Sequence, residues 1–300
     1  MKVIRAKHMG LCFGVRDAIE VALVEAEKSP FTVLGDLVHN EGVLETLALA
    51  GVERSGSLDT VSNRRVMITA HGSSDRRRQQ VIDAGHELLD ATCPLVRNAH
   101  ERLRRLVACG YHPVVIGRKG HVEVEGLIGD FPGADVLLST EDVSRLRPHR
   151  RFGVVAQTTQ PAQRVRQILA DLRRRFPESE VRFEDTVCRP TKERQSDAEA
   201  LSRLADVMVV VGGPNSNNTR ELAATCRQSC ERVYQVPGPE LLERRWFEPG
   251  DTVGITAGTS TPDDVIVAVE TRLLEWAGEK ERLTDHAVDT RRGEALKTVP

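Results

Sequence analysis

The sequence lacks the close cysteine and histidine pairs from which structural zinc sites are built. None of Cys12, Cys93 and Cys188 has a CxxC or CxxxH partner, so zinc-finger spacing is excluded. A nucleotide-binding loop is also missing, because the glycine-rich stretch 212–215 (GGPN) matches neither a P-loop nor a GxGxxG fingerprint. The role of the cysteines must therefore be sought in another arrangement.

Strong charge and long apolar runs are absent as well. The 300 residues carry a formal net charge of −2, which provides no general surface for nucleic acid or acidic membranes. The longest strongly apolar stretch, Val207–Val211, is far too short to span a bilayer, and residues 1–7 contain no signal-peptide core. We therefore expect a soluble cytoplasmic protein that binds neither nucleic acid nor a membrane and keeps its cysteines reduced.

Three cysteines divide the chain into near-equal thirds. Cys12, Cys93 and Cys188 are 81 and 95 residues apart, and they lie in the polar signatures GLCFGV, DATCPLV and DTVCRPT. Reduced cysteines favour metal binding or inert burial over disulfides. Three thiolates brought together could hold an iron–sulfur cluster. Because such clusters usually take four cysteines, one iron would then remain open to a substrate.

Six short apolar runs, each followed by a polar cluster, predict buried parallel strands. Helix-like segments usually follow them, which indicates α/β architecture with ligands outside the carboxyl ends of the strands. The runs fall two to each third of the chain, so we expect a weak threefold repeat. The predicted strands are Phe31–Leu34, Val66–Ala70, Val114–Gly117, Gly153–Ala156, Val209–Gly212 and Val253–Thr256. The predicted α/β lobes span residues 1–95, 96–187 and 188–280, with a C-terminal tail over 281–300.

Several of the polar clusters also have the composition of helix starts. Hydroxyl or amide caps, some followed by proline, are typical of such starts, and the free N–H groups of a helix N-terminus suit phosphate. Any one cluster could be an ordinary cap, but together they favour a shared anionic ligand. The clusters are Thr159-Gln160-Pro161, Asn217-Asn218-Thr219 and Ser260-Thr261-Pro262.

His39, His71 and His121 each stand at a predicted strand end. A lone histidine there is more often structural, but three at equivalent places would form a positively polarised pocket for phosphate oxygens. The remaining histidines have no such setting. We expect them to be surface or packing residues, and they include His8, His86, His100, His112 and His149.

Glu123 lies two residues beyond His121. A surface carboxylate is the ordinary interpretation, but burial beside a cluster would raise its pKa and make it a proton donor. Thr158 and Thr159 are either simple cap residues or hydrogen-bond partners of a substrate hydroxyl.

Taken together, the motifs resemble those of the 4-hydroxy-3-methylbut-2-enyl diphosphate reductase family. The resemblance runs in order from Cys12 to about Asp263, and nine ordered motifs make it highly specific. The motifs are GLCFGV (10–15), VHN (38–40), AHGS (70–73), DATCPLV (90–96), GHVEVEG (120–126), QTT (157–159), DTVC (185–188), NSNN (215–218) and AGTSTP (257–262).

The resemblance implies three α/β lobes in a pseudo-threefold arrangement around a central [4Fe-4S] cluster. The cluster would be held by Cys12, Cys93 and Cys188, and its fourth iron would be open to the substrate's hydroxyl. Glu123 and Thr158 would be catalytic, with Thr158 beside that hydroxyl. Two electrons, delivered singly by ferredoxin or flavodoxin, and two protons would remove the hydroxyl as water in the last step of the methylerythritol phosphate isoprenoid pathway. The implied diphosphate-binding residues are His39, His71, His121, Thr158, Ser216, Asn217, Asn218 and Ser260.

The chain departs from the family pattern at a few positions. Arg189 and Pro190 follow Cys188, where the family more often has a small residue at the position of Pro190. Asn217 stands where many members have serine, Arg118 where a histidine is common and Val122 where proline is frequent. A paralogous iron–sulfur reductase or hydro-lyase acting on a related allylic diphosphate is the alternative. A non-enzymatic phosphate- or isoprenoid-binding descendant is disfavoured by retention of Glu123 and the three histidines.

Overall fold

The structure is a computed structural model that describes residues 1–294, with side chains described as far as Gly278. Three four-stranded sheets form, and every strand pair in them is parallel. The α/β prediction with three sheets is therefore confirmed. The chain divides into two compact units, one of residues 11–193 and one of residues 1–10 with 194–300.

The unit of residues 11–193 contains two of the sheets. The first has the order β3 (Glu53–Ser55), β2 (Phe31–Leu34), β4 (Arg65–Ile68), β5 (Glu87–Asp90). The second has the order β7 (Asp135–Leu137), β6 (His112–Ile116), β8 (Arg151–Ala156), β9 (Glu180–Phe183). In each sheet the chain runs from one central strand to the edge strand beside it, and then from the other central strand to the opposite edge strand. The gap between the two central strands is therefore a topological switch point, where ligands of such sheets bind.

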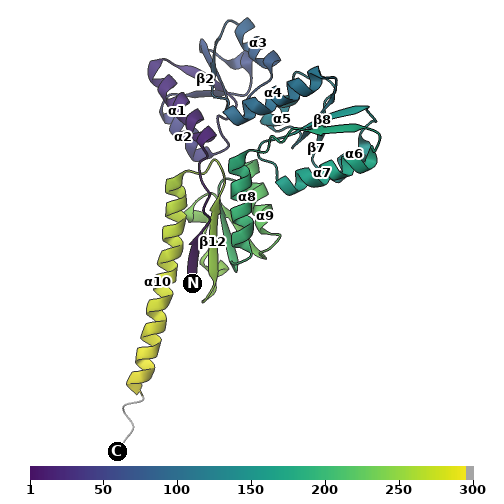
Figure 1. The fold of residues 1–300 in the computed structure, drawn as a ribbon. Coiled ribbons are helices and arrows are strands. Elements are labelled where there is room, and N and C mark those ends of the chain that lie inside the picture. Colours follow the sequence, from purple (N-terminus) through teal and green to yellow (C-terminus); the bar gives the residue numbers. More distant parts are fainter. Residues whose placement is uncertain (295–300) are drawn as a thin grey trace, which may run out of the picture. The chain divides into compact units, whose positions relative to one another are not determined.

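The other unit contains the third sheet. Its order is β1 (Lys2–Arg5), β12 (Thr252–Ala257), β10 (Val207–Val211), β11 (Arg232–Val236). The first strand of the chain thus pairs with the last, and the two lie side by side in Figure 1. The exact boundaries of the three predicted lobes remain a prediction.

All six predicted strands exist, and they are the central pair of each sheet, β2 with β4, β6 with β8 and β10 with β12. The six edge strands carry polar residues along short segments, such as ERS in β3 and KVIR in β1. Apolar runs mark strands buried on both faces, so the sequence pattern indicated only the central ones.

Helices cover both faces of the second and third sheets. Side chains of α6 (Thr140–Arg145) and α7 (Ala162–Arg175) pack on one face of β6 and β8, and those of α4 (Pro94–Ala108) and α5 (Val122–Ile128) on the other. In the third sheet, α10 (Asp263–Glu294) packs on one face, and α8 (Arg189–Ser202) with α9 (Asn217–Cys226) on the other. Figure 1 shows α10 and α8 on opposite sides of β12.

The first sheet buries one face against α1 (Phe13–Lys28) and α2 (Glu41–Leu49). A further helix, α3 (Asp75–Asp83), follows β4. Three short 3-10 helices complete the described elements: η1 (Leu58–Thr60), η2 (Pro239–Leu241) and η3 (Arg244–Trp246).

The C-terminal end of the chain forms α10, which reaches Glu294. The predicted tail over 281–300 therefore falls partly in this helix, and residues 295–300 lie outside the described part. Among the described residues, none of the helices combines the length and the apolar character needed to cross a bilayer.

Candidate functional site

Each of the three signature cysteines stands at the start of a helix in the unit of residues 11–193. Cys12 is the N-cap of α1, Cys93 is the N-cap of α4, and Cys188 directly precedes α8. Free N–H groups and the positive end of the helix dipole stabilise negative charge there. Sulfur at these positions is therefore placed to act as a thiolate ligand.

The three thiols lie close enough to interact electrostatically. Burial raises the pKa of Cys93, and it raises that of Cys188 to about 11. In both cases the neighbouring Cys12 and Glu123 raise the pKa further, because each can carry negative charge. Without a cation, the buried thiols are thus protonated at neutral pH. A metal centre would compensate the charge of the thiolates.

The donor groups of this site are the free thiols of Cys12, Cys93 and Cys188. Thiolates are the ligands that iron–sulfur clusters take. The donor set therefore fits such a cluster.

Close approach of the cysteines depends on Gly14. A Cβ at this position would lie 2.3 Å from the Sγ of Cys93, so any larger residue at position 14 would collide with the sulfur. On the other side, the Sγ of Cys188 donates a hydrogen bond to the Oγ1 of Thr191 at 3.0 Å. Neither Gly14 nor Thr191 was singled out from the sequence. Each lies two or three residues after a signature cysteine, at a helix start. This position could have identified both residues in the sequence.

His39, His71 and His121 form a triangle of imidazole rings. The ring centroids are 4.3 Å apart for His39 and His71, 5.4 Å for His39 and His121, and 5.7 Å for His71 and His121. They follow β2, β4 and β6, so two switch points contribute to one cluster. Burial, together with the two neighbouring rings, holds the pKa of His71 well below its usual value. An anion bound at the triangle would reverse this effect, because it favours the protonated rings.

Glu123 is buried in the first turn of α5, with 2% of its surface exposed. Its Oε1 accepts a hydrogen bond from the backbone N–H of Thr158 at 2.7 Å. Burial raises the pKa of Glu123 to about 7, although hydrogen bonds from Thr158 oppose the shift. The carboxyl group therefore exchanges a proton near neutral pH, as a general acid requires.

Hydrogen bonds from backbone N–H groups connect Glu123 to His121 and, through Thr158, to Cys188. The backbone N–H of Glu123 donates to the Nδ1 of His121 at 3.1 Å. The carbonyl of Thr158, at the end of β8, accepts from the backbone N–H of Cys188 at 2.9 Å. The predicted proton donor, a predicted phosphate ligand and a predicted metal ligand thus share one rigid network.

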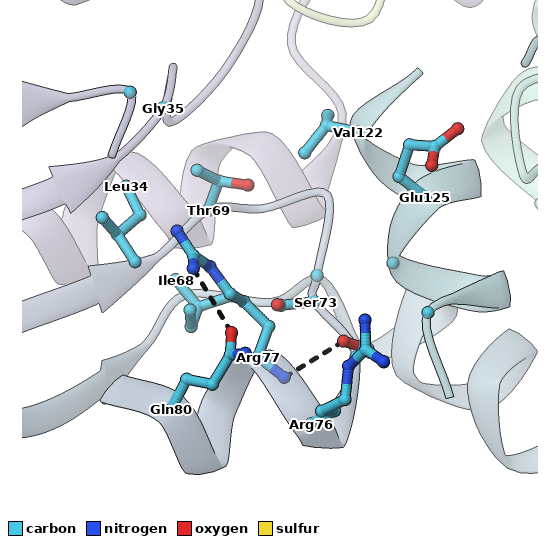
Figure 2. Close-up of a pocket in the computed structure, with 15 residues that line it drawn as sticks. Leu34, Gly35, Ile68, Thr69, Ser73, Arg76, Arg77, Gln80, Val122 and Glu125 are labelled. Carbon is cyan, nitrogen blue, oxygen red and sulfur yellow. Dashed lines mark hydrogen bonds between the residues drawn. The ribbon is translucent and has the colours of Figure 1, made fainter. Parts of the chain in front are cut away.

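A cavity of about 520 Å³ opens beside the segments that follow β4 and β6. Figure 2 shows Leu34 and Ile68 of two strands, the start of α3 at Arg76 and Arg77, and the start of α5 at Val122 around it. The Arg77 guanidinium donates to the Oε1 of Gln80 at 3.3 Å. Ligand sites of small molecules commonly have volumes of about 300–1,000 Å³. The loops that carry His71 and His121 therefore border a space of ligand size.

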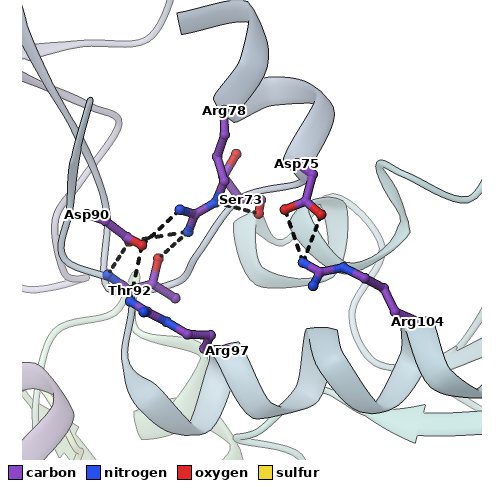
Figure 3. A network of polar contacts seen from close by, with 7 residues as sticks. All are labelled: Ser73, Asp75, Arg78, Asp90, Thr92, Arg97 and Arg104. Atoms are coloured by element: carbon purple, nitrogen blue, oxygen red, sulfur yellow. Dashed lines mark hydrogen bonds and ion pairs between the residues drawn. The ribbon is translucent and has the colours of Figure 1, made fainter. Parts of the chain in front are cut away.

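A salt-bridged network anchors the segment that precedes Cys93. Arg78 of α3 donates to both carboxylate oxygens of Asp90, at 2.8 and 3.2 Å, and to the hydroxyl of Thr92 at 2.9 Å (Figure 3). Arg97 adds a bond to Asp90 at 3.1 Å. Burial alone would raise the pKa of Asp90, but the hydrogen bonds from Arg78 and Thr92 lower it to about 2. The turn before Cys93 is thus held by a permanently charged carboxylate.

The remaining predicted phosphate ligands belong to the other unit and lie at the ends of β10 and β12. Ser216 is the N-cap of α9 and accepts from the backbone N–H of Thr219 at 3.3 Å. Asn217 and Asn218 are buried, and among the described residues their Nδ2 atoms have no hydrogen-bond partner. Ser260 is buried in the turn before α10. Buried donors without a partner are costly, and an anion would satisfy them.

One detail of this turn corrects the prediction. The sequence was expected to place Asn217-Asn218-Thr219 ahead of a helix that begins at Arg220. The helix instead begins at Asn217, and Ser216 is the cap. The asparagines belong to the first turn, so their backbone N–H groups join the free donors of the helix start. The predicted starts of α7 and α10, at Ala162 and Asp263, are confirmed.

The unusual residues after Cys188 are accommodated in the first turn of α8. Arg189 points to solvent, with 87% of its side chain exposed, and pairs with Glu193 at 2.6 Å. Pro190 is the second residue of the helix, where the missing N–H is tolerated. The departure from the family pattern therefore leaves the Cys188 thiol itself unobstructed by the arginine side chain.

Known proteins match this chain over most of its length. A family model described as "LytB protein" matches residues 3–274. A 4-hydroxy-3-methylbut-2-enyl diphosphate reductase of Geobacter sulfurreducens is 36% identical over 282 residues, covering 93% of this chain and 99% of the relative. The reductase of the same name from Aquifex aeolicus is 34% identical over 280 residues, covering 91% and 96%.

Two solved structures are similar over most of their length. The E-1-hydroxy-2-methyl-but-2-enyl-4-diphosphate reductase of Plasmodium falciparum superposes with a TM-score of 0.84 at 25% identity, covering 89% of this chain and 86% of that one. A second structure, described as the terminal enzyme of the non-mevalonate pathway, superposes with a TM-score of 0.65 at 33% identity, covering 92% and 100%.

Proposed function

Because this chain belongs to the LytB family, we propose that it reduces (E)-4-hydroxy-3-methylbut-2-enyl diphosphate to isopentenyl and dimethylallyl diphosphates. The family predicted from the sequence motifs is confirmed, and the predicted activity is the one for which the relatives are named. The observation that carries the proposal is the shared network in the unit of residues 11–193. It joins the buried Glu123 to His121, one of three adjacent histidines, and through Thr158 to Cys188, one of three cysteines at helix starts.

The reaction removes the allylic hydroxyl as water. One C–O bond breaks, and two electrons and two protons are consumed for each diphosphate reduced. An iron–sulfur cluster held by Cys12, Cys93 and Cys188 would supply the electrons and an open Lewis-acidic iron for the hydroxyl. Ferredoxin or flavodoxin would be the one-electron donor, and reduced thiols suit a cytoplasmic enzyme.

The protein's own residues bind the substrate and move the proton. His39, His71 and His121 would hold diphosphate oxygens and take up protons as the anion arrives. Glu123, whose burial raises its pKa to about 7, would deliver a proton from its carboxyl group. Thr158 holds that carboxyl in place through its N–H and would align the substrate hydroxyl.

In the other unit, the start of α9 would bind phosphate. The Nδ2 atoms of Asn217 and Asn218 are buried donors that need an acceptor, and Ser216 stands at the same helix N-terminus. Ser260, at the end of β12, would add a hydroxyl. Helix N-termini with free N–H groups are suited to this role.

An anaerobic assay tests the proposal. The protein reconstituted with iron and sulfide should be brown, and with reduced methyl viologen it should convert the hydroxymethylbutenyl diphosphate to the two isoprenoid diphosphates. Cys93→Ser should lose the cluster absorption. A colourless wild-type protein after reconstitution would refute the iron–sulfur assignment, and a brown protein without turnover would point to a related substrate.

Glu123→Gln tests the proton role. The substitution keeps the shape of the side chain and removes its proton, so turnover should fall about 10²–10⁴-fold with the cluster absorption unchanged. Glu45→Gln, an exposed glutamate on α2, is the matched control and should leave turnover unaltered. Full activity of the Glu123 variant would show that the proton comes from elsewhere.

A further inference from the structure

A second cluster of metal-ligand residues lies in the unit of residues 11–193, at the amino ends of strands of the second sheet. Thr158 and His121 lie beyond the carboxyl ends of strands of the same sheet. His112 is the first residue of β6, Asp135 is the first residue of β7, and His149 lies two residues before β8. These three strands are neighbours in the order β7-β6-β8. Parallel pairing therefore brings the three side chains together at the amino ends of the strands, and the sequence distances between them gave no sign of it.

The three side chains are already within coordinating distance of one another. One ligand atom from each lies within 4.8 Å of the other two, and among the described residues this is the group that meets that spacing. The Nε2 of His112 and the Oδ2 of Asp135 are 2.7 Å apart. The rings of His112 and His149 stack at 3.7 Å between centroids, inclined by 6°.

The surroundings hold the two rings in place. The ring of Phe152 lies edge to face against both imidazole rings. Its centroid is 6.1 Å from that of His112 and 5.5 Å from that of His149. The backbone carbonyl of His149 accepts a hydrogen bond from Ser179 at 2.7 Å. His112 keeps 17% of its side chain exposed and Asp135 keeps 39%. Water and a hydrated ion can therefore reach the cluster.

The charge balance favours a cation. Two stacked imidazoles repel each other when both are protonated. The neutral ring is the form that binds metal. Binding of one ion requires the stacked rings to open, because the nitrogen lone pairs of imidazole lie in the ring planes.

We propose that His112, Asp135 and His149 form a binding site for a divalent transition-metal ion of the zinc type, separate from the cysteine site. Two imidazoles and one carboxylate are a donor set of zinc and related ions, with water completing the coordination. Binding would replace the 2.7 Å contact between the Nε2 of His112 and the Oδ2 of Asp135 by bonds to the ion. The ion would join the starts of three adjacent strands, so it would stabilise this sheet independently of the reductase activity.

Zinc titration of the cluster-containing protein tests the site. Calorimetry under anaerobic conditions should detect one site for Zn²⁺, and His149→Ala and Asp135→Asn should each weaken binding at least about tenfold. Zinc X-ray absorption should show nitrogen and oxygen neighbours at about 2.0–2.1 Å and no sulfur at about 2.3 Å. His8→Ala is the matched control, because His8 pairs with Asp197 at 2.7 Å without a second histidine. It should bind zinc as the wild type does.

Three results would overturn the proposal. They are the absence of zinc binding by the folded wild type, binding that neither substitution weakens, and sulfur in the zinc coordination shell. His149 lies in a connecting loop and is partly exposed, so His149→Ala should fold. Its unchanged cluster absorption and circular dichroism would verify this.

Discussion

At the scale of single residues, the site depends on side chains that are small as much as on those that react. Gly14 is the clearest case, because a Cβ there would lie 2.3 Å from the sulfur of Cys93. Thr191 is similar in kind, since its hydroxyl contacts the sulfur of Cys188 at 3.0 Å. These residues determine whether the thiols can approach one another, which the reactive residues by themselves do not.

Gly14→Ala should therefore lose iron. The added methyl group must displace Cys93 or the start of α1, so cluster content after reconstitution should drop severalfold or more. Iron and sulfide analysis measures this directly. Gly42→Ala is the matched control: Gly42 is also the second residue of its helix, and its new Cβ would meet its nearest neighbour at 3.5 Å. That substitution should keep the cluster and stabilise α2 by up to about 1 kcal/mol. Equal iron content in the two variants would contradict the steric argument.

The candidate reactive residues are proposed from the sequence, whereas their surroundings became known only from the structure. The cysteines, the histidines and Glu123 lie in short signatures at strand ends. The buried carboxyl of Glu123, whose pKa is about 7, lies against Thr158, which follows β8 and is 35 residues away in the sequence. Likewise, the stacking of His112 on His149 is invisible in a sequence where both have the character of surface or packing residues.

At the scale of elements, the carboxyl ends of central strands carry most of the site. His39 and His71 follow the central pair of the first sheet, and His121 and Thr158 follow that of the second. The central strands were predicted because both of their faces are buried, which requires continuous apolar runs. Edge strands such as β5 and β9 mix charged and apolar residues, so a pattern of hydrophobicity did not separate them from loops.

The position of the start of α4 depends on charged side chains that precede it. Asp90, Arg78 and Thr92 connect the end of β5 to α3 just before Cys93. The lowered pKa of Asp90, about 2, means that its stabilising effect is present above its ordinary pKa and is lost as the pH falls through about 2.

Asp90→Asn should destabilise the protein at neutral pH. The carboxylate is partly exposed, so solvent screening reduces the loss in the free energy of unfolding to about 1–2 kcal/mol. Urea unfolding at pH 7 measures it. Asp83→Asn at the exposed end of α3 is a control that should change stability by less than about 0.5 kcal/mol. An Asp90 variant as stable as the wild type at pH 7 would show that the network is redundant.

At the scale of the whole molecule, the buried carboxyl of Glu123 couples folding to pH. Its pKa is about 7 in the folded protein and near 4.5 when exposed. Below pH 4.5 the group is protonated in both states, so its contribution is fully favourable. As the pH rises through about 7 that contribution is lost, because the folded chain must then hold a buried charge.

Glu123→Gln should therefore gain stability relative to the wild type as the pH rises. The difference in unfolding free energy between the two proteins should grow by at most about 3 kcal/mol between pH 4.5 and pH 8. Urea unfolding of both proteins in the cluster-free form measures it, so that loss of iron at low pH does not enter. A difference that stays constant over this range would mean that Glu123 is ionised throughout.

The amino-acid sequence was sufficient for the class of fold, the central strands and the family, because each of these leaves a local signature. Apolar runs form buried strands, and small polar residues at the strand ends form turns and helix starts. Which side chains meet became known only from the folded chain. Folding brings together three histidines from three separate loops, buries Glu123 against Thr158, and places Cys12 beside both Cys93 and Cys188. Distances and desolvation arise from packing between distant segments, and no local pattern of residues specifies them.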